Sequence, residues 1–148
     1  MDRRELLGLL GAGSAGFLAL GGTGEARADH EHKHLDKGHQ ECLEACTTCG
    51  QECEFMFNHC AKLVVDGHKE HAKSARLALD CADFCALSAK MIARMSSLMV
   101  YSCMACAEAC KKCGDECAKF DMPEMKHCAE VCRKCEASCR EMVKAMQA

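Results

Sequence analysis

Residues 42–53 read CLEACTTCGQEC, and this spacing of four cysteines occurs twice more along the chain. It returns as CAEACKKCGDEC over residues 106–117 and as CAEVCRKCEASC over 128–139, and a shorter piece, CADFC, occupies residues 81–85. The steps between cysteines alternate between four and three residues. Because an α-helix has about 3.6 residues per turn, positions i, i+4, i+7 and i+11 lie on one face. The repeat therefore predicts helices that each carry a stripe of cysteines.

The residues between and beyond these stripes divide the chain into helices and turns. Alanine, glutamate, lysine, arginine and glutamine fill most intervening positions, and these residues favour helix. Asp66-Gly67 is a helix-ending signal, Ser96-Ser97 can cap the third helix, and Asp121 with Pro123 can start the fourth. Short turns make consecutive helices antiparallel neighbours. We therefore expect an all-α, antiparallel up-down-up-down four-helix bundle with a cysteine-lined core, its helices spanning 35–65, 69–95, 98–119 and 123–146.

Folding the chain at these three turns brings the stripes of the four helices to matching levels. Successive levels one helical turn apart lie about 5 Å apart, from the 1.5 Å rise per residue. The predicted layers are Cys60, Ser74, Cys117 and Cys128; Cys53, Cys81, Cys113 and Cys132; Cys49, Cys85, Cys110 and Cys135; Cys46, Ser88, Cys106 and Cys139; Cys42, Ile92, Cys103 and Met142; and His39, Met95, Met99 and Met146. Each of the sixteen cysteines is used once, so a column of sulfur is predicted inside the bundle.

Composition excludes several classes of function. The chain has 148 residues, enough for one modest domain. One Pro, one Tyr, five Phe and no Trp argue against an aromatic-cored enzyme or a β-sandwich, and a net charge of −3 from mixed acids and bases gives no basic surface for nucleic acid. The C-x2-C pairs lie in mid-helix, whereas a redox-active thiol is expected at an exposed helix N-terminus. We therefore do not expect an enzyme.

The first 28 residues are predicted to be a leader rather than part of the fold. A twin arginine at residues 3 and 4 precedes an apolar run over 6–20, and residues 26–28 offer an A-x-A cleavage site. This pattern resembles a twin-arginine (Tat) signal; ordinary secretion, a membrane anchor and an unfolded tail are the alternatives. The apolar run is short beside the roughly 20 residues of a spanning helix. We expect a signal peptide over 1–28 and an exported, periplasmic bundle over 29–148, without stable membrane insertion.

So many inward cysteines leave three kinds of core to weigh: plain apolar packing, a disulfide framework, or metal storage. Cysteine packs as a small hydrophobe, but sixteen of them would leave voids that leucine would fill. Cysteines at i and i+4 on one helix are poorly placed to bridge each other, and although pairs across helices are feasible, a scaffold needs only a few bridges. Thiolates select soft metals such as Cu(I), zinc and iron–sulfur clusters. An interior filled with cysteines therefore favours metal storage over plain apolar packing or a disulfide framework.

Among the soft metals, the spacing favours Cu(I). The iron–sulfur run C-x2-C-x2-C-x3-C-P is absent from the sequence. Zinc prefers closed tetrahedral sites, so layers with only two or three thiols would go unused. Cu(I) accepts two or three sulfurs, and one thiolate can bridge two ions, so neighbouring layers can share ligands. We therefore predict storage of multiple Cu(I) ions per chain, with a zinc or general soft-metal buffer built from discrete four-cysteine sites as the alternative.

Weaker soft donors gather at the end of the predicted bundle where the first helix begins. Methionine and histidine bind Cu(I) less tightly than thiolate does, so we interpret this end as the copper entry. Methionines at helical spacing also serve as plain core, and a histidine run is also typical of a solvated tail. The residues predicted at this end are His39, Met91, Met95, Met99, Met104, Met142 and Met146, with His30, His32 and His34 just upstream. At the opposite end we expect surface histidines, namely His59, His68, His71 and His127.

The repeated C-x3-C-x2-C-x3-C helices, the cysteine-poor second helix and the twin-arginine leader resemble an exported member of the bacterial copper storage protein family. The resemblance implies a four-helix bundle that assembles as a homotetramer and holds many Cu(I) ions, with a copper-requiring enzyme or a copper chaperone as a partner. Carried over by position, it assigns as metal ligands Cys42, Cys46, Cys49, Cys53, Cys60, Cys81, Cys85, Cys103, Cys106, Cys110, Cys113, Cys117, Cys128, Cys132, Cys135 and Cys139. It also implies a methionine and histidine mouth, to which we assign His39, Met95, Met99 and Met146.

Overall fold

The structure is a computed structural model that describes residues 35–147. Its elements are α1 (Lys37–Val65), the short 3-10 helix η1 (Lys69–His71), α2 (Ala72–Ala93), α3 (Met99–Cys117) and α4 (Pro123–Gln147). The described part of the chain contains no strand, which confirms the predicted all-α class. No described helix has the length and hydrophobicity needed to cross a membrane. The predicted leader over 1–28 and the histidines upstream of the bundle lie outside the described residues.

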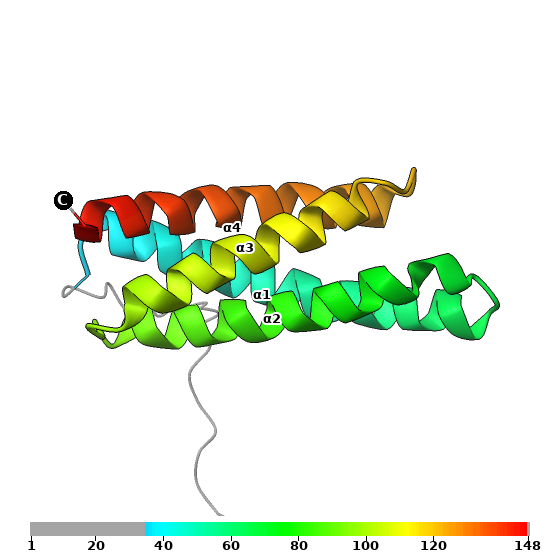
Figure 1. The fold of residues 1–148 in the computed structure, drawn as a ribbon, viewed down its shortest axis with the longest axis horizontal. Coiled ribbons are helices and arrows are strands. Elements are labelled where there is room, and N and C mark those ends of the chain that lie inside the picture. Colours follow the sequence, from blue (N-terminus) through cyan, green and yellow to red (C-terminus); the bar gives the residue numbers. More distant parts are fainter. Residues whose placement is uncertain (1–34, 148) are drawn as a thin grey trace, which may run out of the picture. The chain divides into compact units, whose positions relative to one another are not determined.

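The four helices form the predicted antiparallel bundle, in which each helix packs against two others (Figure 1). α1 and α3 both pack against α2 and α4, whereas the diagonal pairs meet through interior side chains, such as Cys49 and Cys110, whose sulfurs lie 3.8 Å apart. The N-terminus of α1, the α2–α3 turn and the C-terminus of α4 lie at one end, which we call the His39 end. The α1–α2 and α3–α4 turns lie at the other, which we call the Cys60 end.

The turn after α1 follows the sequence prediction. Gly67 has a φ of +102°, the left-handed conformation that glycine adopts without a Cβ clash. Its N–H donates to the Val64 carbonyl at 3.1 Å, and the His68 N–H donates to the Leu63 carbonyl at 2.9 Å. This pair of bonds satisfies the last free carbonyls of a helix and reverses the chain. The Asp66-Gly67 signal is thus confirmed.

The turn after α2 begins earlier than predicted, because α2 ends at Ala93 rather than at residue 95. Met95 adopts a φ of +51° and its side chain is 46% exposed. The Met95 N–H donates to the Ile92 carbonyl at 2.9 Å, and the Ser96 N–H donates to the Met91 carbonyl at 3.0 Å. A methionine thus occupies the helix-ending position that Gly67 fills after α1. The prediction that Met95 faces the interior on a helix is therefore wrong.

The starts of α3 and α4 differ in how well they were predicted. Leu98, not a serine, is the N-cap of α3, and the Ser96 hydroxyl instead accepts a hydrogen bond from the Leu98 N–H at 3.3 Å within the turn. α4 begins at Pro123, as predicted, where a missing N–H costs nothing. Asp121 forms an ion pair with Lys126 in the first turn of α4.

Two glycines lie at helix–helix contacts beside the cysteines. A Cβ built at Gly50 in α1 would lie 3.4 Å from the Cβ of Cys85. A Cβ at Gly114 in α3 would lie 3.2 Å from the Cβ of Cys132, closer than ordinary van der Waals contact. The Cβ of Cys132 is fixed to the backbone of α4 and cannot rotate away. Gly114 therefore sets how closely α4 approaches α3.

Alanine at these two glycines should have opposite effects on stability. In mid-helix the change from glycine to alanine gains about 1 kcal/mol, but overpacking costs about 1–3 kcal/mol. We expect metal-free Gly114→Ala to unfold at a lower temperature than the wild type, and Gly50→Ala to unfold at the same or a higher temperature. Thermal unfolding of the reduced proteins, followed by circular dichroism, measures both. Equal or greater stability of Gly114→Ala relative to Gly50→Ala would contradict the packing described.

Candidate metal centre

All sixteen cysteines are buried, and most of their sulfur atoms gather into groups in the bundle interior. Within each group the sulfur atoms all lie within 4.8 Å of one another. From the His39 end, the groups are Cys42, Cys103 and Cys139; Cys46, Cys106, Cys135 and Cys139; Cys49, Cys85, Cys110 and Cys135; Cys49, Cys53, Cys81 and Cys132; and Cys53, Cys113, Cys128 and Cys132. These groups bring together fourteen of the predicted ligands.

Neighbouring groups have cysteines in common, so together they form one continuous column. Cys139 belongs to the first two groups, Cys135 to the second and third, and Cys49 to the third and fourth. Cys53 and Cys132 both belong to the last two groups. An ion held by one group would therefore share a ligand with the ion in the next group. Bridging thiolates require this arrangement.

The sulfur–sulfur distances suit a soft ion held between two thiolates. The Cys46 Sγ lies 3.5 Å from the Cys139 Sγ, and the Cys49 Sγ lies 3.9 Å from the Cys132 Sγ. A disulfide needs about 2.05 Å between the sulfurs, and all sixteen cysteines are free in the structure. A metal ion lies about 2.3 Å from a thiolate sulfur, so two sulfurs on opposite sides of it are about 4.6 Å apart. Small side-chain rotations thus suffice to admit an ion.

Burial and crowding keep most of these thiols protonated in the metal-free bundle, whereas hydrogen bonds from neighbouring thiols lower the pKa of Cys42, Cys49, Cys106 and Cys113. Burial raises the pKa of Cys60 to about 11. Hydrogen bonding to the Cys110 thiol, together with burial, raises the pKa of Cys81, and the Cys106 thiol acts in the same way on the pKa of Cys135. Adjacent thiolates would repel one another in a medium of low dielectric constant. Binding of a soft cation must therefore displace protons from the core.

At the His39 end, the first turn of α1 and the last turns of α4 enclose a surface hollow of about 370 Å³. Its lining includes His39, Met142 and Met146, which are predicted soft donors, together with the carboxylates of Glu41 and Glu141. The His39 Nδ1 lies 2.9 Å from a carboxylate oxygen of Asp36. We call this feature the His39 hollow. It places three weaker ligands at the end of the sulfur column nearest Cys42.

Comparison with known proteins identifies the family. The sequence profile described as "Copper storage protein" matches residues 35–144, which is most of the chain. The chain belongs to the copper storage protein family.

Relatives of this copper storage protein agree with that assignment. The cysteine-rich protein YhjQ of Bacillus subtilis (strain 168) is 35% identical over 108 residues, which cover 73% of this chain and 98% of that protein. The structure titled Cu(I)-bound copper storage protein BsCsp3 is 34% identical, with a TM-score of 0.68, covering 72% of this chain and 99% of that one. A protein from Nitrosospira multiformis is 33% identical, with a TM-score of 0.66, covering 75% and 99%.

Within this family member, the predicted level layers are largely found, with some exchange of partners between neighbouring levels. The layer of Cys49, Cys85, Cys110 and Cys135 is confirmed. Elsewhere predicted partners stay together and a cysteine from the next level joins them, as Cys139, rather than Met142, joins Cys42 and Cys103. Every Cα–Cβ bond tilts toward the N-terminus of its own helix. Side chains on antiparallel neighbours therefore tilt in opposite directions and meet partners from the next level.

The predicted end layer with Cys60 is not found as a single group. The Cys117 Sγ lies 3.8 Å from the Cys128 Sγ, as that layer requires. The Cys60 Sγ instead lies 3.6 Å from the Met56 Sδ and 3.8 Å from the Met125 Sδ, and Cys60 belongs to none of the cysteine groups. Met125 was not among the predicted ligands; its spacing of three residues before Cys128 is the sequence signal that it shares the inward face.

Ser74 and Ser88 occupy inward positions of α2 where the other helices carry cysteine. Both are fully buried, and neither hydroxyl has a hydrogen-bond partner in the structure. This confirms the inward placement of the cysteine-poor stripe of α2. An unpaired buried hydroxyl is destabilising by about 1–3 kcal/mol, so these two positions weaken the metal-free bundle.

The methionines predicted at the entry do not all line the His39 hollow. Met95 lies on the exposed α2–α3 turn, and Met99 is buried in the core of the bundle. Met91 is half-buried, and its Sδ accepts a hydrogen bond from the Arg94 guanidinium at 2.9 Å. These three side chains are absent from the lining of the hollow. The predicted cluster is thus divided: His39, Met142 and Met146 line the hollow, whereas Met91, Met95 and Met99 do not.

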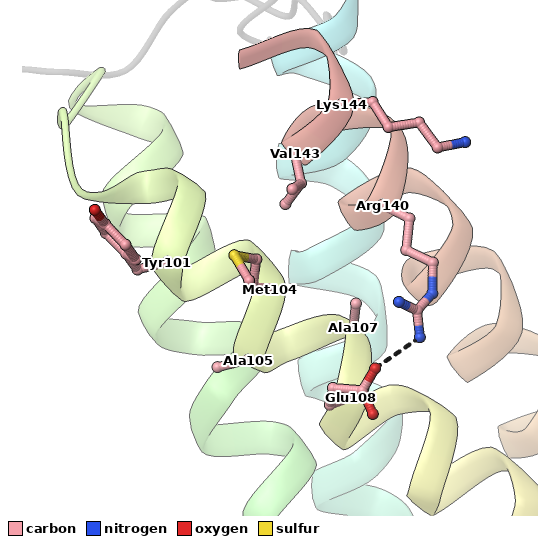
Figure 2. Close-up of a pocket in the computed structure, with 8 residues that line it drawn as sticks. All are labelled: Tyr101, Met104, Ala105, Ala107, Glu108, Arg140, Val143 and Lys144. Carbon is pink, nitrogen blue, oxygen red and sulfur yellow. Dashed lines mark hydrogen bonds and ion pairs between the residues drawn. The ribbon is translucent and has the colours of Figure 1, made fainter. Parts of the chain in front are cut away.

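Met104 lies outside the sulfur column, in a groove between α3 and α4. Figure 2 shows Met104 on α3 in this groove, whose far wall carries Val143 and Arg140 of α4. The Arg140 guanidinium bridges the groove to the Glu108 carboxylate at 2.9 Å. Met104 is 48% exposed. The prediction that Met104 belongs to the entry is therefore wrong, because its position on α3 faces away from the cysteine stripe.

Near the Cys60 end, two buried polar contacts are not predicted by the sequence. His71, predicted to lie at the surface, is buried and stacks on Phe120 with ring centroids 4.2 Å apart. Glu116 is also buried and binds Lys119 at 2.7 Å and Lys73 at 2.8 Å, which lowers the pKa of the Glu116 carboxyl. The Lys73 contact ties α2 to α3. The His71–Phe120 and Lys73–Glu116 contacts join residues far apart in sequence, so helical periodicity carries no sign of them.

The raised thiol pKa values predict that the metal-free bundle loses stability in alkali. An ordinary thiol has a pKa of 9.0, and Cys60 in the folded chain has a pKa of about 11. Below pH 9 the Cys60 thiol is protonated in both the folded and the unfolded chain, so the free energy of unfolding keeps its full value. Between pH 9 and 11 the thiol ionises first in the unfolded chain, so the free energy of unfolding falls. We expect the melting temperature of the reduced, metal-free protein to fall over this range, and to fall less in Cys60→Ser. A melting temperature that is constant or rises from pH 9 to 11 would contradict protonated core thiols.

Proposed function

We propose that this protein stores Cu(I), with many ions per chain bound by the cysteine thiolates inside the bundle. The observation that carries the proposal is the column of five sulfur groups linked by shared cysteines. The related structure of BsCsp3 is titled as Cu(I)-bound, which supports Cu(I) as the metal. All sixteen cysteines are the proposed ligands, as predicted from the sequence.

Charge balance supports a large capacity. A buried charge is costly unless an opposite charge compensates it. One Cu(I) ion per thiolate gives a neutral interior, because each ion replaces one thiol proton. The core cysteines have essentially no exposed surface, and no carboxylate belongs to the five groups. A closed set of thiolates without an open coordination position or a neighbouring acid suits storage rather than catalysis.

The number of Cu(I) ions bound per chain tests this function. Reduced protein is titrated with Cu(I) under nitrogen against a competing chromogenic chelator, with copper and protein quantified separately. We expect about one ion per thiol, on the order of a dozen or more per chain, because shared thiolates let neighbouring groups fill together. A parallel titration with zinc is the control. Saturation at two to four ions, with zinc competing effectively, would favour the alternative of discrete four-cysteine zinc sites.

We further propose that copper enters through the His39 hollow, where His39 and Met146 offer weaker ligands than the core. The structure leaves Met95 and Met99 out of this hollow, so the entry set is narrower than the sequence suggests. Asp36, Glu41 and Glu141 beside the donors attract a cation to this end. An ion bound in this hollow would lie at the same end of the bundle as the outermost cysteine group, which contains Cys42.

Removing the entry donors should slow loading without changing capacity. We expect the double variant His39→Ala/Met146→Ala to take up Cu(I) several-fold more slowly than the wild type and to reach the same final copper content, because the core thiolates are intact. Stopped-flow transfer from a Cu(I)–chelator complex measures the rate. Met104→Ala, which removes an exposed methionine from the α3–α4 groove, is the matched control. Equal loading rates for the double variant and the control would exclude this entry.

The family resemblance also leads us to propose a homotetramer, exported with its leader to the periplasm and exchanging copper with a chaperone or a copper-requiring enzyme. Apolar side chains exposed on α2 and α3 support contact with further copies of the chain. They are Leu79, Phe84, Leu87, Tyr101 and Met104. The mass of the bundle in solution, measured by light scattering, distinguishes a tetramer from a monomer.

A further inference from the structure

Three sulfur atoms form a separate cluster at the Cys60 end of the bundle. Met56 and Cys60 lie one turn apart on α1, and Met125 lies in the first turns of α4. The Cys60 thiol approaches the Met56 Sδ at 3.6 Å and the Met125 Sδ at 3.8 Å, so Cys60 is the common neighbour of the two thioethers. All three side chains are buried, with exposed fractions of 0% for Cys60, 2% for Met56 and 0% for Met125.

This cluster is chemically unlike the rest of the interior. The other cysteines have cysteine sulfurs as neighbours, Cys117 through its contact with Cys128, whereas the sulfur contacts of Cys60 are both methionines. Methionine sulfurs are neutral ligands and carry no proton to displace. The arrangement therefore offers one potential thiolate and two thioethers.

We propose that Cys60, Met56 and Met125 form a distinct three-sulfur site for one Cu(I) ion, closing the column at the end remote from the His39 hollow. This site rests on the proposed storage of Cu(I), and it adds two methionines to the ligands of that store.

The geometry suits three-coordinate binding. With an ion about 2.3 Å from each sulfur, a planar three-sulfur arrangement places the sulfurs about 4 Å apart. The two contacts of Cys60, at 3.6 and 3.8 Å, are within a few tenths of an ångström of that spacing. Methionine side chains have three rotatable bonds and adapt readily to a small displacement. Two of the three sulfur–sulfur spacings of such a site are therefore already close to those that an ion requires.

Charge makes this site selective for a monovalent soft ion. Binding of Cu(I) breaks the Cys60 S–H bond, releases one proton to solvent and forms a copper–thiolate bond, so the buried cluster stays neutral. A zinc ion in the same place would leave one positive charge uncompensated, which is costly in a buried site. Because thioethers are neutral donors, they hold the ion less tightly than the bridged thiolates do. The site therefore has a lower affinity for Cu(I) than the column and fills after it.

Methionine methyl resonances test the site directly. The full chain, labelled with 13C at the methionine methyl groups, is titrated with Cu(I) under reducing conditions, and copper per chain is measured in the same samples. Met56→Leu and Met125→Leu assign the two signals. We expect both methyl resonances to shift together in a late step that corresponds to one ion. The methyl of Met104, exposed on the flank of α3, is the internal reference and should stay in place.

Cys60→Ser is the matched variant, because it removes the thiolate and leaves both thioethers. We expect this variant to load the column while the Met56 and Met125 methyl signals stay at their metal-free positions. Unmoved signals at copper saturation of the wild type would overturn the site, as would equal shifts in Cys60→Ser. If Cys60→Ser does not fold, the wild-type titration alone tests the three-sulfur site. A wild-type chain that takes up no copper would instead overturn the storage function on which the site rests.

Discussion

Thiol crowding inside four antiparallel helices is the constraint on which the rest of this structure depends. Sulfur atoms such as those of Cys46 and Cys139 lie 3.5 Å apart, too far for a disulfide and too close for neighbouring thiolates without a cation between them. The metal-free core therefore cannot hold neighbouring thiolates side by side, and a soft cation is the partner that lets adjacent thiols ionise together. Small residues and the close approach at Gly114 bring the stripes into this spacing.

The two ends of the sulfur column differ in chemistry. The His39 hollow opens to solvent between α1 and α4 and combines histidine, methionine and carboxylates. At the Cys60 end, the donors Met56, Cys60 and Met125 are buried, and His71 stacks on Phe120. With entry at the His39 hollow, as proposed, copper would meet the weaker donors first and the stronger thiolate ligands beyond them. The proposed storage of Cu(I) thus accords with the order of ligands along the bundle.

Much of this arrangement is readable from the sequence because helical periodicity is local. The stripe containing Cys49 and the turn at Gly67 depend on residues within a few positions of each other, and both agree with the structure. Contacts between helices are harder to predict from the sequence, because the exchange of partners between layers and the pairing of Cys60 with Met125 depend on side-chain tilt and helix crossing. Met95 was misplaced for another reason, since methionine rarely adopts the positive φ that ends α2.

X-ray absorption at the copper edge of the fully loaded protein tests the central claim most directly. Ions bridged by shared thiolates should give a first shell of two or three sulfurs and a second shell of copper neighbours. The cysteines shared between neighbouring groups predict both signals, because each ion would share a ligand with the next. A first shell dominated by nitrogen or oxygen, or sulfur coordination without copper neighbours, would contradict a connected column of Cu(I) inside the bundle.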